Sequence, residues 1–306
     1  RLGLFAPDSG QIARHVEPLN QFSEQWMSLA DHAPPLLLAY QRKSGVVRAF
    51  SLETGQALKD RDLDVGEDGL VQAAFGRLFC FREAELSVFC VERKACVARI
   101  VVAETSNDRF EAALTVRSAN EALIVRTGHG FVDRLTLSAA ASPVSASGDD
   151  NKRSGSSASS SASEHRRDTI ETTGGWRVRA AFATRAGYLV ITVVANHYGL
   201  HLLRDGSSSL QRLRTIEAKG AGFALRRGAH DGGNKSRDIL VFVAETHGVL
   251  LVDAENGATL RSIALPASRH SSRVEQVLVN YRHLVLSFGS KVWNRADRHC
   301  LVFDLA

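Results

Sequence analysis

The stretch ETHGVLLVDAENGATLRSI, residues 245–263, reads as a strand, a turn, a second strand, another turn and a third strand. A second stretch, REAELSVFCVERKACVARI at residues 82–100, aligns with it without a gap. Their apolar positions coincide in these pairs: Val249 with Leu86, Leu251 with Val88, Val252 with Phe89, Leu260 with Val97 and Ile263 with Ile100. One repeat unit has therefore been copied and has diverged, and a repeat is more informative about architecture than a lone hairpin.

A turn residue within the stretch 245–263, Gly248, marks the register of each unit. The equivalent positions along the chain are Gly45, Glu85, Gly130, Gly199, Gly248 and His299. Successive spacings are 40, 45, 69, 49 and 51 residues, and the interval of 69 contains a Ser/Ala tract of about 26 residues. Without that tract this spacing agrees with the others. The chain therefore contains six units with a period of 40 to 50 residues.

Each unit repeats one order of strands. The first strands include residues 70–76, 176–184 and 273–281, and the more apolar second strands are 35–40, 77–81, 121–125, 188–195, 238–244 and 283–288. A third strand follows the marker, and a turn with Gly or Asn leads to a fourth. The second strands are nearly continuous apolar runs, as expected of strands covered on both faces. A helical pattern is limited to residues 17–29.

Four strands at this period are what a β-propeller blade requires. We predict an all-β fold: a six-bladed β-propeller of four-stranded antiparallel blades, with seven blades as the alternative, in one domain over residues 1–306. The sixth unit stops after its third strand. Residues 2–6 are expected to supply the outer strand of that blade, which closes the ring and removes exposed strand edges. If the chain is a fragment, sequence beyond Ala306 would close the ring instead.

The tract ASPVSASGDDNKRSGSSASSSASE, residues 141–164, has no aromatic residue and one branched aliphatic residue. Such a composition buries too little apolar surface to become ordered. We predict a disordered Ser/Ala-rich insertion over residues 141–167, between the third and fourth strands of the third blade. A tolerated surface loop and a phosphorylated loop both stay open, because KRSGS places basic residues near serines.

Two stretches resemble known propeller repeats. AFSLETGQALK, residues 49–59, matches the quinoprotein (PQQ-like) pattern A-x-D-x-x-T-G-x-x-x-W at Ala49, Thr54 and Gly55, and LVDAENGATLR, residues 251–261, matches it at Asp253 and Gly257. Both lack the tryptophan that locks quinoprotein blades together. Asp253 and Asp304 lie where the Trp-Asp pair of a WD40 repeat ends. The chain is therefore more similar to a divergent WD40-like family, which implies a platform that organises other proteins.

Three histidines beside the marker positions, His129, His197 and His247, invite comparison with a zinc site. Equivalent positions on adjacent blades are expected to lie on the order of 12 Å apart, too far for three ligands to share one ion. The chain also lacks a P-loop, a HExxH pair and a nucleophile elbow. We therefore predict no catalytic residues, no metal and no cofactor. A quinoprotein-like or hydrolytic propeller enzyme is the second alternative function.

The segment 201–240 carries most of the excess positive charge. It contains eight basic residues against four acidic ones, and residues 228–238 lengthen a loop of the fifth blade. The candidate partner-binding basic lobe consists of Arg204, Arg212, Arg214, Arg226, Arg227, Lys235 and Arg237. Such a lobe could bind an acidic protein surface or RNA. Aromatic residues for base stacking are not interleaved with it. An RNA- or ribonucleoprotein-associated propeller is the first alternative function.

The composition of the whole chain bears on membrane association, metal binding and cellular compartment. The formal net charge of +5 is modest, and the longest apolar run has eight residues where a membrane span needs about 20. The four cysteines fit no metal-binding spacing and are expected to be buried free thiols, Cys90 and Cys300 on apolar strand positions. These features favour an intracellular scaffold in a reducing compartment, bound to other proteins and not to a membrane. They do not choose among cytoplasm, nucleus, flagellum and mitochondrion.

Overall fold

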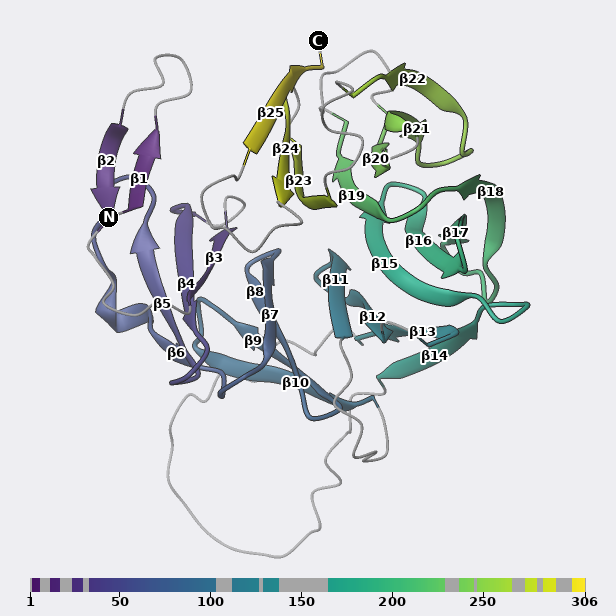
Figure 1. Ribbon diagram of the computed structural model, residues 1–306. Coiled ribbons are helices and arrows are strands. Elements are labelled where there is room, and N and C mark those ends of the chain that lie inside the picture. Colours follow the sequence, from purple (N-terminus) through teal and green to yellow (C-terminus); the bar gives the residue numbers. More distant parts are fainter. Residues whose placement is uncertain are drawn as a thin grey trace, which may run out of the picture. The chain divides into compact units, whose positions relative to one another are not determined.

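The computed structural model describes residues 2–5, 12–16, 24–29, 33–102, 112–126, 129–137, 165–228, 237–244, 247–265, 273–279, 283–289 and 299–305. Over these residues the secondary structure is β-strand, apart from one 3-10 turn, η1 (Lys59–Arg61) (Figure 1). The strands form antiparallel sheets in which neighbours in sequence are neighbours in space. This meander topology confirms the predicted all-β class and the antiparallel repeat.

The chain forms two compact units. The first consists of Arg1–Arg109, Val116–Ile124 and Asp133–Asp168, and the second of Phe110–Thr115, Val125–Val132 and Thr169–Ala306. The first unit holds a two-stranded sheet, β1 (Leu2–Phe5) and β2 (Ile12–Val16), and two four-stranded sheets. Their strands are β3 (Glu24–Leu29), β4 (Leu36–Gln41), β5 (Val46–Ser51) and β6 (Leu63–Asp64), then β7 (Leu70–Ala74), β8 (Arg77–Arg82), β9 (Glu85–Cys90) and β10 (Ala95–Val101).

A third four-stranded sheet has residues in both units. Its strands are β11 (Ala112–Ser118), β12 (Glu121–Arg126), β13 (Phe131–Thr136) and β14 (Arg166–Glu171). The second unit adds two four-stranded sheets and a three-stranded one. These are β15 (Arg177–Thr184), β16 (Gly187–Val194), β17 (His197–Arg204) and β18 (Gln211–Glu217); β19 (Ala221–Arg226), β20 (Ile239–Ala244), β21 (Gly248–Asp253) and β22 (Thr259–Ile263); and β23 (Arg273–Val279), β24 (His283–Gly289) and β25 (His299–Asp304).

The predicted burial of second strands on both faces is confirmed most clearly by β20. Its alternate residues Leu240 and Phe242 join a core cluster with the β15–β18 sheet. The intervening Val241 and Val243 join a cluster with the β23–β25 sheet. Neighbouring sheets thus pack face to face, and a strand between two of them needs apolar side chains on both sides. The same packing joins the β3–β6 and β7–β10 sheets in the first unit.

The two stretches that resemble quinoprotein repeats form the same turn. In one, the Ser51 Oγ accepts hydrogen bonds from the Glu53 and Thr54 backbone N–H groups at 3.2 and 3.1 Å. In the other, the Asp253 Oδ1 accepts them from Glu255 and Asn256 at 2.9 and 3.3 Å. A glycine with positive φ ends each turn, at +72° in Gly55 and +75° in Gly257. Ser51 and Asp253 are therefore structurally equivalent, as the sequence alignment predicts.

Three sequence expectations need correction. Residues 24–29, within the segment expected to be helical, form strand β3, which pairs with β4 over six residues. Gly199 is the third residue of β17, because the preceding turn is made by residues 195–196, where Ala195 has a φ of 49°. The first strand expected over residues 70–76 ends at Ala74, and the next two residues form a tight turn.

The first and last strands belong to different sheets. Strand β1 falls where residues 2–6 were expected to be extended, but its partner is β2 in a sheet of their own. The sheet of β23–β25 has three strands within the described part of the chain. The number of blades and the closure of the ring therefore stay predictions.

Residues 141–164 of the predicted insertion lie outside the described residues. Its last two residues, Arg166 and Arg167, already belong to β14, so the fourth strand begins earlier than expected. The cysteines also differ from expectation. All four are free, but only Cys80 is buried, while Cys96 and Cys300 are exposed. Burial raises the pKa of the Cys80 thiol to about 12, which keeps it protonated.

Candidate functional site

Three of the candidate basic residues lie on neighbouring strands of one sheet, Arg204 in β17 and Arg212 and Arg214 in β18. The Arg204 Nε donates a hydrogen bond to the Gln211 side chain at 3.2 Å. The Arg212 guanidinium lies over the Trp176 ring, with 5.2 Å from its Cζ to the ring centroid. This distance is within the range of a cation–π contact.

Arg214 connects two sheets of the second unit. Its Nη1 donates to the Gly257 carbonyl oxygen at 3.4 Å and to the Thr259 hydroxyl in the β19–β22 sheet. His247 makes a second connection between these sheets, with its Nε2 2.6 Å from the Glu217 carbonyl oxygen. Arg214 therefore acts as a structural link between neighbouring sheets.

The other candidate basic residues border the extended loop of the β19–β22 sheet. Arg226 ends β19 and is half-buried, and Arg227 is exposed. Arg237 forms an ion pair of 3.6 Å with Asp253, although 63% of its side chain is exposed. Lys235 lies outside the described residues. The structure thus places Arg204, Arg212 and Arg214 on one sheet, with Arg212 and Arg214 on opposite faces of it, and places Arg226, Arg227 and Arg237 at the next.

The ends of this loop are held by a buried carboxylate. Asp238 accepts hydrogen bonds from the Arg185 backbone N–H at 2.8 Å and the Gly228 backbone N–H at 3.2 Å. The Arg185 side chain also donates to the Gly228 carbonyl oxygen at 3.2 Å. Asp238 is 2% exposed, so these bonds replace those that water would supply. The loop therefore starts and ends at fixed points.

A buried polar cluster in the β15–β18 sheet was missed by the sequence reading. His201 and Thr192 face each other, with 2.9 Å between the ring Nε2 and the hydroxyl oxygen. Trp176 contacts the His201 ring edge-on at 6.2 Å between centroids. Burial, together with the charge of Arg212, lowers the pKa of His201 to about 4, so the imidazole is neutral at physiological pH.

Gly199 makes room for this cluster. A Cβ at that position would lie 2.5 Å from the His201 Nε2 and 2.7 Å from the Thr192 hydroxyl oxygen. Neither distance is compatible with a methyl group. A glycine inside a strand is the sequence signal that could have revealed the cluster, because it often marks a close approach of another group.

The three histidines considered as metal ligands have separate roles. His129 contacts Phe131 with tilted rings whose centroids are 5.6 Å apart, His197 is exposed at the start of β17, and the His247 ring is hydrogen-bonded to the Glu217 carbonyl oxygen. No group of three or more His, Cys, Asp or Glu side chains suited to a metal ion occurs among the residues that the structure describes. That these histidines do not share one ion stays a prediction.

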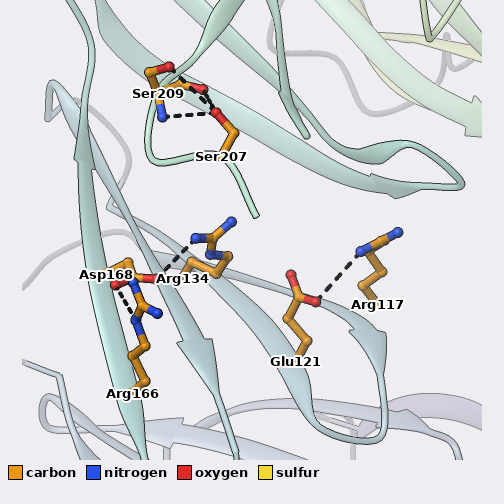
Figure 2. A network of polar contacts seen from close by, with 7 residues as sticks. All are labelled: Arg117, Glu121, Arg134, Arg166, Asp168, Ser207 and Ser209. Atoms are coloured by element: carbon orange, nitrogen blue, oxygen red, sulfur yellow. Dashed lines mark hydrogen bonds and ion pairs between the residues drawn. The ribbon is translucent and has the colours of Figure 1, made fainter. Parts of the chain in front are cut away.

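Charged side chains join β13 to β14 on both faces of their sheet. On one face, the Arg167 Nε donates to Asp133 at 3.0 Å, and Asp133 is fully buried. On the other, Arg134 and Arg166 donate to Asp168 at 3.0 and 2.8 Å (Figure 2). The hydrogen bond from Arg134 is the largest cause that lowers the pKa of Asp168. We call these residues the charge ladder.

Exposed apolar side chains are few in the described part of the chain. Large ones are Phe75, Val101, Val194, Leu260, Leu278 and Val302, and Phe75 is the only aromatic residue among them. The sequence reading placed Phe75 in a strand and assigned it no role. An Ala-Phe-Gly sequence between two strands, where Asn-Gly is favoured, is the signal that it overlooked.

The comparisons with known proteins concern the fold. The chain is similar in structure to the WD40 domain of SCAP from fission yeast, with a TM-score of 0.52 and 9% sequence identity. The match covers 83% of this chain and 56% of that chain. No protein-family model matches, and no curated protein sequence matches. The helix of the described residues is far too short to cross a membrane. The likeness and the antiparallel sheets together fit a WD40-like repeat fold.

Proposed function

We propose that this protein is a non-catalytic WD40-like β-propeller scaffold, which binds other proteins within a larger intracellular assembly. The proposal is supported above all by the fold, a series of four-stranded antiparallel sheets similar in structure to a WD40 domain. The basic residues that the sequence offers for partner binding are largely engaged in the protein's own structure: Arg212 on Trp176, Arg214 on the next sheet and Arg237 on Asp253. These side chains therefore stabilise contacts between and within the protein's own sheets.

This use of arginine weakens the RNA alternative more than the protein alternative. Binding to RNA depends on Lys and Arg side chains that neutralise phosphates, and its affinity falls steeply with salt. Protein interfaces depend mainly on a buried apolar centre with a polar rim. A rigid β scaffold with fixed loop ends, such as the Asp238-anchored loop, suits the second kind of recognition.

The experiment is a tagged purification of the full chain at low and high salt, with and without nuclease, followed by mass spectrometry and size-exclusion chromatography. We expect a defined set of proteins that survives both treatments and co-elutes with the chain in fixed proportion. The variant Arg227→Glu, which reverses an exposed charge, is expected to retain that set. Loss of all partners on nuclease treatment would favour the RNA alternative, and retention of a small molecule without proteins would favour an enzyme.

A further inference from the structure

The hairpin of β7 and β8 ends in a two-residue turn. Ala74 pairs with Arg77, so Phe75 and Gly76 alone make the connection. Both have positive φ, 53° and 69°, as in the tight turns that match the twist of a hairpin. Such turns favour Asn or Gly at both positions, because other side chains clash with the backbone in this conformation.

Phe75 is unusual in both its conformation and its exposure. Six non-glycine residues of the described chain have positive φ, and Phe75 is the only aromatic one. Its exposed fraction is 42%, so the strained conformation does not serve to bury the ring. A costly backbone conformation at an exposed apolar residue points to a role outside folding.

The turn stands on a fixed base. The Gly76 carbonyl oxygen accepts a hydrogen bond from the Val91 N–H at 3.2 Å, which ties the turn to the neighbouring β9–β10 turn. Arg77 donates to the Ala119 carbonyl oxygen at 2.8 Å and to the Asn120 side chain at 3.2 Å. Phe75 is therefore presented by a braced turn, which lowers the entropic cost of binding.

The surroundings of Phe75 set the chemistry of its partner. The β9–β10 turn carries Glu92, Arg93 and Lys94, all exposed. Because the Arg77 side chain is held by Ala119 and Asn120, the exposed rim consists of two basic residues and one acidic residue. An apolar anchor with a basic rim fits an apolar pocket bordered by carboxylates. Base stacking on RNA generally uses successive aromatic residues, and here one exposed aromatic ring stands by itself in the described part of the chain.

We infer that Phe75 is the anchor of a docking surface, formed by the β7–β8 and β9–β10 turns, for a protein partner that has an apolar pocket with an acidic rim. This inference rests on the proposed function and specifies the surface that carries it. Burying an aromatic side chain of this kind is expected to account for at least a tenfold change in affinity.

The substitution Phe75→Asn separates docking from folding. Asn-Gly is the favoured sequence for this turn, so the variant is expected to raise the midpoint of thermal unfolding by about 2–4 °C. The same variant is expected to reduce capture of the specific partner at least tenfold. The matched control is Val101→Thr, because Val101 is exposed at the opposite end of the same sheet and pairs with Glu85. It is expected to leave capture unchanged.

A direct probe is a photo-crosslinking amino acid, p-benzoylphenylalanine, placed at position 75 of the full chain. A protein that crosslinks at this position, and whose capture Phe75→Asn reduces, supports the inference. A crosslink only to RNA, only to a second copy of the chain or to nothing would overturn it, as would a lowered unfolding midpoint in Phe75→Asn. If captured proteins persist undiminished in Phe75→Asn, the scaffold proposal stands and this surface is wrong. If no proteins are captured at all, both fall.

Discussion

Acidification is expected to destabilise the protein through His201. The folded-state pKa is about 4, whereas an unfolded histidine titrates near 6.5. The unfolded state therefore binds the proton first as pH falls. The stability that His201 contributes is fully present above about pH 6.5, and it is lost as pH falls through the folded pKa. The difference of about 2.5 pKa units corresponds to about 3 kcal/mol in the free energy of unfolding.

The assay is urea unfolding followed by tryptophan fluorescence, since Trp176 contacts the His201 ring. The parent and His201→Gln are compared at about pH 7 and pH 5. Glutamine can still bond to Thr192 but does not titrate in this range. Below about pH 6.5 the unfolded parent binds a proton at residue 201 that the folded parent does not bind, and this lowers its free energy of unfolding by about 1.4 kcal/mol per pH unit. Over the roughly 1.5 pH units down to pH 5, the stability difference between parent and variant is therefore expected to shrink by about 2 kcal/mol. A difference that stays constant across this range would refute the reasoning.

Three further predictions concern packing, the charge ladder and ring closure. Gly199→Ala places a methyl group 2.5 Å from the His201 Nε2, and is expected to cost about 1–3 kcal/mol of unfolding free energy in urea titrations at neutral pH. Asp168→Asn leaves Arg134 partly without its anion, and is expected to cost about 1–3 kcal/mol; an unchanged urea midpoint would show that the ladder contributes nothing. If residues 2–6 close the ring, deletion of residues 1–8 should lower the thermal midpoint by more than about 5 °C, and a truncated chain as stable as the parent would contradict closure.

The repeated strands could be predicted from sequence because their burial is encoded locally. Strand β20 needs apolar residues at every position, since Leu240 and Val241 enter cores on opposite faces. The turn shared by Ser51 and Asp253 was equally visible, because a side-chain acceptor followed four residues later by glycine has one local geometry.

The details that could not be predicted depend on residues distant in sequence. From the composition of its segment, Arg214 is expected to be available to bind a partner. Its hydrogen-bond acceptors, Gly257 and Thr259, belong instead to the next sheet of the same chain. Likewise, the His201 ring is enclosed by contacts with Thr192 and Trp176, which come from other parts of the same repeat. Register near Gly199 was misjudged because spacing alone does not distinguish a turn glycine from one that avoids a clash inside a strand.

The charge ladder also bears on how this chain tolerates change. Strands β13 and β14 are separated by 29 residues, 137–165, where a tight hairpin would need two. Closing the longer loop costs about 2 kcal/mol more, and doubling its length would add only about 0.6 kcal/mol. The pairs Asp133–Arg167 and Arg134–Asp168 fix the strand register without help from the connection. We therefore expect the β13–β14 pairing to survive changes in the length and sequence of the connection, including the insertion of a guest domain.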